Sequence, residues 1–382
     1  MNMKRGELMQ VRSAYIHIPF CVRICTYCDF NKYFIHNQPV DEYLDCLIKE
    51  MEQSEVRTLE TLFVGGGTPT ALSYEQLEKL LQAITRIFTI EGEFSFEANP
   101  DELTLEKVQL LHEYGVNRLS MGVQTFKQEL LDILGRTHRT ADIYQAVDHA
   151  RQVGIPSISL DLMYDLPKQS LDDFKVSLEL ALSIDIDHIS SYGLILEPKT
   201  QFYNLYRKGK LKLPSEDLGE AMYTHLMHRM EESDMHQYEI SNFAKVGHES
   251  EHNKVYWKNE GYYGFGAGAS GYVDGERYTN VNPVNHYIKK IEQNERPLLH
   301  STFPTRDEQM EEEMFLGLRM NRGVSIQRFH EKFDEPIDNV YGQTINDLIQ
   351  RGLLVKQGDF LSMTERGKVI GNEVFEAFLL SV

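Results

Sequence analysis

The segment Tyr15-Ile-His-Ile-Pro-Phe-Cys21-Val-Arg-Ile-Cys25-Thr-Tyr-Cys28 places three cysteines directly after a short apolar strand. Three thiolates on one loop can hold three irons of a cubane cluster, because such clusters are built on cysteine ligands. The fourth iron then lacks a protein ligand, and an open position on a metal centre is where an exogenous molecule binds. The spacing therefore predicts an iron–sulfur cluster that does more than support the fold.

The alternative for this cysteine loop is a zinc site completed by His17 or His36. Structural zinc usually joins two ligands that lie two to four residues apart to a second such pair, and no second pair follows here. The remaining cysteine, Cys46, lies in an apolar helix-like run and is expected to be a small buried residue. Four cysteines grouped in this way favour a metal site in a reducing compartment over a disulfide framework.

Beyond the cysteine loop, short apolar or alternating segments are separated by longer amphipathic ones. This alternation is typical of repeated β-α units and a parallel sheet. The expected strands are 14–18, 61–64, 93–99, 117–124, 157–163, 187–193 and, more weakly, 236–240. Helical apolar spacing follows Ser73 and Ser170, which stand where helix N-caps belong. Six or seven such strands predict a complete or partial barrel.

Polar groups gather at the ends of these expected strands. The run Gly65-Gly66-Gly67-Thr68-Pro69 follows one strand, and glycines let a ligand approach the backbone closely. Glu97, Gln124 and Asp161 each lie on the polar face near the carboxyl end of a later strand, which is where β/α barrels form active sites. Singly, Glu97 and Asp161 could be internal salt-bridge partners. Their recurrence favours a polar, cationic ligand above the barrel.

The pattern of apolar residues changes after about residue 245. The Gly- and aromatic-rich stretch 261–272 predicts a loop. From about Thr305, two or three helices precede a tight turn at Gln357-Gly-Asp, an order that resembles a winged helix. We divide the chain into a tail at 1–13, a barrel at 14–245, a connecting region at 246–304 and a winged-helix-like domain at 305–382.

Charge and hydropathy narrow the function classes. The chain has 382 residues, with 58 Asp and Glu against 39 Lys and Arg, and a net charge of −19. That balance argues against sequence-independent nucleic-acid binding, which needs clustered cations, and it makes docking the expected role of the acidic C-terminal domain. No apolar run approaches the roughly 18 residues of a bilayer span, and no apolar segment follows the basic start, so a cytoplasmic protein is expected.

The cysteine spacing, Tyr27 before the last cysteine and the Gly-Gly-Gly-Thr-Pro loop together resemble the radical S-adenosylmethionine (SAM) superfamily. Over nearly the whole chain the sequence resembles the oxygen-independent coproporphyrinogen III oxidase group, and within it the HemW-type heme chaperones. The narrower match lies in 15–21, Tyr238-Glu-Ile-Ser-Asn-Phe-Ala and His252-Asn-Lys-Val-Tyr-Trp257. The resemblance implies an α/β fold, a partial (β/α)6-type TIM-like barrel with a smaller C-terminal winged-helix-like domain.

The resemblance also implies the cofactors and the residues that hold them. A [4Fe-4S] cluster would lie on Cys21, Cys25 and Cys28, with SAM on its open iron and heme as a third cofactor. By the family's pattern the SAM site would be lined by Tyr15, Tyr27, Gly66, Gly67, Thr68, Glu97, Gln124, Arg136, Asp161 and Gly193. Arg136 would pair with the SAM carboxylate, while Glu97 and Asp161 would take its amino group and ribose hydroxyls.

For heme, the resemblance points to His252 as the axial iron ligand, with Tyr256 and Trp257 packed on the macrocycle. Without the resemblance, a single histidine beside aromatic residues is more often a hydrogen-bonded structural residue.

Three functions stay open. The first is a heme chaperone that passes heme to client apo-hemoproteins, with a reductant protein as a further partner and a homodimer as a possible assembly. The second is an anaerobic coproporphyrinogen III oxidase. True oxidases of this group usually carry a fourth cysteine where Phe30 stands and a longer segment before the cluster, so we prefer the chaperone and leave enzymatic activity open. The third is a zinc-stabilised binding protein.

Overall fold

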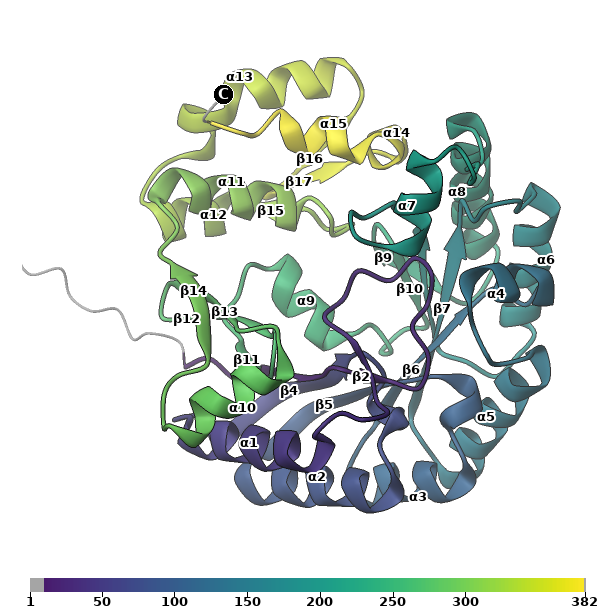
Figure 1. The fold of residues 1–382 in the computed structure, drawn as a ribbon. Helices are drawn as coiled ribbons and strands as arrows, with labels where there is room; N and C mark the ends of the chain where they lie inside the picture. The colour runs from purple at the N-terminus through teal and green to yellow at the C-terminus, as the bar shows by residue number, and fades with distance from the viewer. Residues whose placement is uncertain (1–9, 381–382) are drawn as a thin grey trace, which may run out of the picture.

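The computed structural model describes residues 10–380, which build around one curved sheet (Figure 1). Its strand order is β11-β1-β4-β5-β6-β7-β8-β10-β9, and neighbours from β11 to β8 are parallel while β10 is antiparallel to β8 and β9. The strands are β1 (Ser13–Ile18), β4 (Thr58–Gly66), β5 (Thr89–Ala98), β6 (Arg118–Gln124), β7 (Ser157–Tyr164), β8 (His188–Gly193), β9 (His236–Glu239), β10 (Asn242–Ala244) and β11 (Tyr263–Phe265). All seven expected strands are confirmed. Of the expected tail, residues 1–9 lie outside the described residues.

Helices form a ring outside this sheet, as a partial β/α barrel requires (Figure 1). They are α1 (Val40–Gln53), α2 (Tyr74–Ile87), α3 (Leu105–Glu113), α4 (Gln128–Leu134), α5 (Thr140–Val153), α6 (Leu171–Leu182) and α8 (Glu216–Glu231), with short 3-10 turns η1 (Pro69–Ala71) and η2 (Pro100–Glu102). The Ser73 and Ser170 side chains accept hydrogen bonds from the third residues of α2 and α6 in capping boxes. Both expected N-caps are therefore confirmed.

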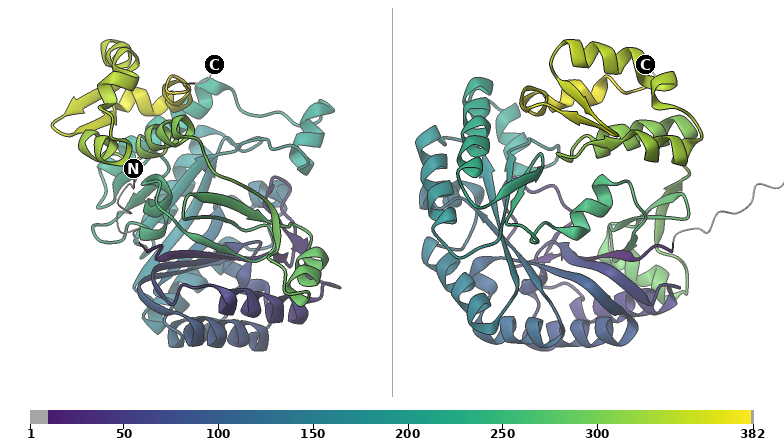
Figure 2. Two further views of the ribbon diagram at one scale, coloured as in Figure 1. Left: turned by 90° about the vertical axis from the view of Figure 1, so that its left-hand side faces the viewer. Right: turned by 180° about the vertical axis from the view of Figure 1, so that it is seen from behind.

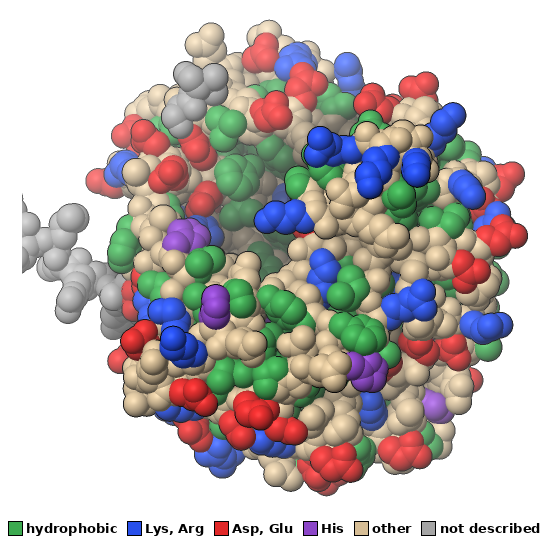
Figure 3. Space-filling view, viewed as in Figure 1, with side chains coloured by type: hydrophobic (Ala, Val, Ile, Leu, Met, Phe, Trp, Pro, Cys, Tyr) green, Lys and Arg blue, Asp and Glu red, His purple; other side chains and the backbone are tan. Residues whose placement is uncertain are grey.

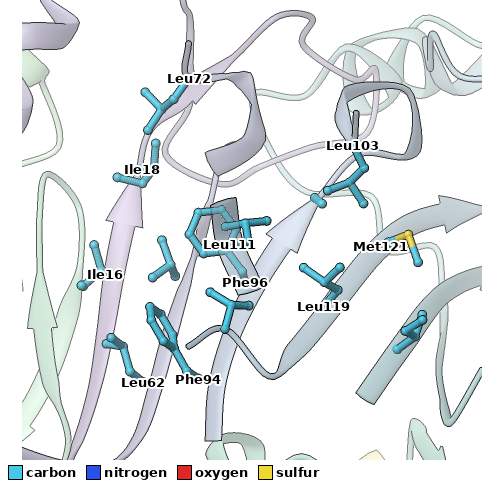
Figure 4. Close-up of a cluster of buried hydrophobic side chains, with 14 of the residues drawn as sticks. Ile16, Ile18, Leu62, Leu72, Phe94, Phe96, Leu103, Leu111, Leu119 and Met121 are labelled. Atoms are coloured by element: carbon cyan, nitrogen blue, oxygen red, sulfur yellow. The ribbon is translucent and has the colours of Figure 1, made fainter. Parts of the chain in front are cut away.

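Alternate residues of each strand point away from the lumen and pack under the helices. Ile16, Leu62, Phe94 and Leu119 come from four neighbouring strands and meet in this layer (Figure 4). Each is at most 1% exposed, so replacing Phe94 by Ala would cost about 3–5 kcal/mol of stability. The intervening residues of the same strands face the lumen, which is how the sheet can combine an apolar core with a polar interior.

The expectation of a loop at 261–272 is wrong. Tyr263–Phe265 forms β11, which pairs in parallel with β1, and Ser270–Val273 forms β12 of a second sheet with β13 (Glu276–Asn280) and β14 (Leu298–Thr302). A Cβ on Gly264 would lie 2.0 Å from the Ser270 carbonyl oxygen. The glycines therefore allow close approach of two chain segments, and long-range pairing overrides their low strand propensity.

The C-terminal part forms its own apolar core and a separate layer above the barrel (Figure 2). Its elements are α11 (Arg306–Gly317), β15 (Val324–Ser325), α12 (Ile326–Phe333), α13 (Ile337–Gln350), β16 (Leu354–Gln357), β17 (Phe360–Met363), α14 (Glu365–Val369) and α15 (Gly371–Glu376). The expected hairpin is confirmed as β16 and β17, with β15 on the other side of β17.

Five further elements complete the described chain. They are β2 (Phe20–Cys21), β3 (Tyr33–Phe34), α7 (Gln201–Arg207), α9 (Glu251–Trp257) and α10 (Val284–Glu292), which lies beside α1. In Figure 1, α9 lies on the concave side of the sheet rather than in the outer ring. Within residues 10–380, no helix has both the length and the hydropathy that crossing a bilayer requires.

Candidate functional site

The cysteine loop lies over the carboxyl ends of the strands. Cys21 ends β2, and all three thiols of the motif line one cavity of ≈ 550 Å³. The loop is anchored to α4, because the Thr26 N–H and hydroxyl donate to the carbonyls of Leu134 (3.0 Å) and Ile133 (3.1 Å). Burial raises the pKa of Cys21 to about 12 and also raises that of Cys28. Thiolates in this place therefore need a strong positive partner, which is the chemistry of a metal site.

The glycine loop after β4 packs directly against the cysteine segment. Gly66 has φ +116°, and a Cβ there would lie 2.4 Å from the His17 ring. A Cβ on Gly67 would lie 2.7 Å from the Phe20 carbonyl oxygen and 3.0 Å from Cys21 Sγ, while the Thr68 hydroxyl donates to that same sulfur at 3.6 Å. Side chains are excluded here for steric reasons, so the loop gives bare backbone to the cavity.

Two carboxylates face this cavity without a cationic partner. Glu97 accepts a hydrogen bond from Gly66 N (2.9 Å), and Asp161 accepts one from the Ser120 hydroxyl (3.2 Å). Burial, together with the Asp161 charge, raises the pKa of Glu97 to about 7, and burial raises that of Asp161 to about 6. Neither forms an ion pair with a described residue, so the salt-bridge alternative fails. A cationic ligand would stabilise the ionised form of both carboxyl groups.

One guanidinium faces the same cavity without a carboxylate partner. Arg136 donates to the Asn99 amide oxygen (2.6 Å) and to the Tyr27 hydroxyl (3.1 Å). Its buried Nε has no hydrogen-bond partner within residues 10–380. A buried, incompletely bonded guanidinium is suited to a bidentate anion such as a carboxylate.

The unpaired groups therefore complement a zwitterion. The incompletely bonded Arg136 guanidinium and the two buried acids Glu97 and Asp161 line a single cavity with the three thiols, so a ligand with an amino group, a carboxylate and hydroxyls would satisfy all of them. An amino acid joined to a sugar has these groups. The residues present fit both a cysteine-held cluster and SAM.

The cavity brings together nearly all of the expected SAM residues. Tyr27, Gly66, Gly67, Thr68, Glu97, Gln124, Arg136, Asp161 and Gly193 line it. Tyr15 does not line it: the ring stacks on Phe63 at 6.1 Å, and the hydroxyl lies 3.0 Å from His17 Nδ1. Gln124 ends β6 with φ +68° and accepts a hydrogen bond from Tyr192 (3.4 Å), a strained position of the kind found at ligand sites.

The expected heme residues lie elsewhere, on α9 against the inner face of β4 and β5. His252 is 1% exposed, with Nδ1 2.9 Å from the Thr61 hydroxyl and Nε2 2.9 Å from the Tyr256 hydroxyl. Burial lowers its pKa to about 3, so the imidazole is neutral. The Trp257 ring is covered by the Arg319 guanidinium at 4.4 Å. None of the three expected heme residues lines the cavity, whereas Asn253 of the same helix does.

Sequence reasoning missed several residues of the cavity floor. Arg118, His188, Ser190 and Tyr192 line it from β6 and β8, and Asn99 orients Arg136. The signal was present, since these positions continue the alternation that identified Glu97 and Asp161.

The structure also bears on the zinc alternative. Within residues 10–380, no three His, Cys, Asp or Glu side chains converge closely enough to hold a single metal ion. His17 is already engaged, because Nε2 lies 2.7 Å from the Asn31 carbonyl oxygen and Nδ1 lies 3.0 Å from the Tyr15 hydroxyl. In a cubane cluster each thiolate binds a different iron, so the three sulfurs do not have to meet at one point.

Comparison with known proteins places this site in a family. Residues 15–181 match the model of the radical SAM superfamily, and residues 305–370 match that of the HemN C-terminal domain. The heme chaperone HemW of Bacillus subtilis (strain 168) is 51% identical, with 97% of this chain and 99% of that protein covered. The heme chaperone HemW of Lactococcus lactis subsp. lactis (strain IL1403) is 44% identical, with 98% of each covered.

A solved structure shows the same fold. Coproporphyrinogen III oxidase (HemN) from Escherichia coli, described as a radical SAM enzyme, superimposes with a TM-score of 0.84. The match covers 97% of this chain and 91% of that one at 24% identity. The expected partial barrel with a smaller C-terminal domain is therefore confirmed.

Proposed function

The chain belongs to the HemW family of radical SAM proteins, and from that premise we propose that it is a heme chaperone that passes heme to apo-hemoproteins. The observation that carries the proposal is one cavity lined by three thiols, by the buried acids Glu97 and Asp161 and by the incompletely bonded guanidinium of Arg136. This set suits a cysteine-held [4Fe-4S] cluster and SAM. The 51% identity to a heme chaperone supports heme as the third ligand.

Different residues of the chain would bind the different polar groups of SAM. Arg136, held by Asn99 and Tyr27, would take the carboxylate. Glu97 and Asp161 would take the amino group and the ribose hydroxyls, while Gly66 and Gly67 leave room beside the thiolates. When bound, the cluster supplies a redox centre with one open coordination position.

We further propose His252 as the axial ligand of heme iron, with Tyr256 and Trp257 on the macrocycle. Its neutral imidazole has a lone pair to give, as a ligand requires. Because the Tyr256 hydroxyl lies 2.9 Å from Nε2, that contact must break before iron can bind there. Heme loading would therefore include a local rearrangement of α9.

The oxidase alternative has less support. The Escherichia coli oxidase is 24% identical to this chain, and that likeness speaks for the fold alone. Phe30 also stands where the oxidases of the group usually carry a fourth cysteine.

The experiment is an anaerobic reconstitution followed by two assays on the full chain. About four irons and four sulfides per chain are expected, as three cysteines of a cubane site imply. Heme-loaded protein should then transfer heme to apomyoglobin, read as the gain of the myoglobin absorption spectrum. Protoporphyrinogen formed from coproporphyrinogen III with SAM and a reductant would instead establish the oxidase, and no heme transfer would overturn the chaperone.

A further inference from the structure

A strongly basic surface surrounds α7, although the chain as a whole carries a net charge of −19. Residues 198–214 contain no Asp or Glu, and their five cations are Lys199, Arg207, Lys208, Lys210 and Lys212. All five are exposed, and none has an ion-pair partner within the described residues. Figure 3 shows Lys and Arg side chains gathered over α7, beside the hollow in this face. We call these five residues the α7 basic patch.

The inner side of this segment is fixed to the cysteine loop. Phe202 is 2% exposed, its backbone N–H donates to the Thr26 carbonyl oxygen (3.0 Å), and its ring centroid lies 6.5 Å from that of Tyr27. Leu211 and Leu213 pack into the same small apolar cluster as Phe202 and Tyr27. Phe202, Leu211 and Leu213 therefore pack toward the cysteine loop, while the five cations and Tyr206 face solvent.

We propose that the α7 basic patch is the docking surface for an acidic flavoprotein of the flavodoxin type that donates one electron. The inference rests on the proposed function, because it needs the [4Fe-4S] cluster. One electron leaves the donor and reduces the cluster from the 2+ to the 1+ state; no bond forms and no proton moves. A donor on this surface is separated from the cysteine loop by a single packed segment.

Two physical arguments select this partner. Complementary charge steers an acidic protein to a basic patch, and on this acidic chain it also selects one orientation for the encounter. The place of the patch is the second argument, because only one packed segment separates it from the cysteine loop, so a donor bound there lies near the cluster. Tyr206 of α7 and the nearby Ile195 are exposed beside the cations, so a lipid surface is the alternative that the test must separate.

The test is stopped-flow reduction of the cluster in the reconstituted full chain by a reduced, acidic flavodoxin. The patch variant is Lys208→Glu/Lys210→Glu. The control, Lys289→Glu/Lys356→Glu, makes the same change in net charge on α10 and β16, and both of its lysines are exposed. It removes one exposed ion pair, Lys356 with Asp338 (3.6 Å), which contributes little to stability. The patch variant should lose about tenfold in second-order rate constant at low salt, within the range that steering provides. The loss should shrink at high salt, while the control keeps the original rate.

Four measurements keep the outcomes distinct. Photoreduced 5-deazaflavin, a small neutral reductant, should reduce all three proteins equally, which shows that the clusters are intact. An unchanged flavodoxin rate in the patch variant, or an equal loss in the control, overturns the proposal. Lost binding to phosphatidylglycerol vesicles with an unchanged flavodoxin rate would make the patch a lipid surface instead. If no cluster assembles in the original chain, the proposed function fails rather than the docking surface.

Discussion

Replacing Tyr256 by Phe should tighten heme binding if His252 is the iron ligand. The Tyr256 hydroxyl lies 2.9 Å from His252 Nε2, and the Thr61 hydroxyl lies 2.9 Å from Nδ1. Tyr256 is on α9 itself whereas Thr61 is on β4, so a local change within α9 can free Nε2 for iron while Nδ1 stays bonded to the sheet. The substitution removes the competing hydroxyl and keeps the ring. That ring packs edge-on against His252 and Tyr262, with centroids 5.1 Å and 4.7 Å away.

The expected size of this effect follows from the bond that heme must displace. A neutral hydrogen bond contributes about 0.5–1.5 kcal/mol net, and 1.4 kcal/mol corresponds to about tenfold in affinity. Tyr256→Phe should therefore lower the heme dissociation constant by about twofold to tenfold. His252→Ala should raise it and change the absorption spectrum, since the axial ligand is lost.

The assay is a heme titration followed at the Soret band, on cluster-loaded and cluster-free protein. Tyr262→Phe is the matched control, because it deletes a neighbouring phenol hydroxyl that makes no contact with the imidazole. Unchanged affinity in Tyr256→Phe together with an unchanged spectrum in His252→Ala would refute the ligand assignment. The histidine would then be a structural residue that ties α9 to β4.

Further predictions concern the SAM site and its supports. SAM should bind more tightly at pH 8 than at pH 6, because burial raises the pKa of Glu97 to about 7 and that of Asp161 to about 6, and protonation removes the charge that holds an amino group. Calorimetric titration at both pH values checks this, and Glu97→Gln should reduce the difference in affinity between them. Because Glu97 and Asp161 hold protons more tightly in the native protein than in the unfolded chain, the unfolding free energy of SAM-free protein should fall as the pH rises from 4.5 through 7. Urea melts at several pH values in that window measure this free energy, and a value that does not fall would contradict the prediction. Arg136→Met should cost about tenfold or more in SAM affinity, with Arg136→Lys recovering only part, and a titration that finds wild-type affinity in both would exclude the guanidinium contact. Gly66→Ala forces a Cβ to within 2.4 Å of His17 at φ +116°, so the midpoint of thermal unfolding and the iron content should both drop, and unchanged values would show that the loop can relax.

Much of the barrel could be predicted because its periodicity is local. Each strand alternates between an apolar residue under the helices, such as Phe94, and a lumen residue, such as Glu97. A period of two assigns both faces without any knowledge of the neighbours. The same alternation placed Asp161 in the cavity before its partners were known.

What could not be predicted depends on contacts between distant segments. Tyr263 is a strand residue because it lies beside Ala14 in the sheet, and nothing in the glycine-rich stretch around it encodes that pairing. Likewise, the burial of His252 depends on Thr61, which precedes it by 191 residues. Its neighbours in sequence indicate aromatic surroundings but do not indicate that both ring nitrogens are engaged. Local pattern fixes the face of a residue, whereas its hydrogen-bond partners follow from the tertiary arrangement.

The two proposed ligand sites share β4 and β5. At the carboxyl ends of these strands, Gly66 and Glu97 face the SAM cavity. Nearer their amino ends, Glu93 accepts the backbone N–H of His252 (3.2 Å), and Phe63 lies between the rings of Tyr15 and His252, with centroids 6.1 Å and 5.3 Å away. A rearrangement of α9 that frees His252 therefore disturbs packing directly beneath the glycine loop. By linkage, any change that SAM makes in heme affinity must equal the change that heme makes in SAM affinity, so titrating each ligand in the presence of the other measures one coupling twice.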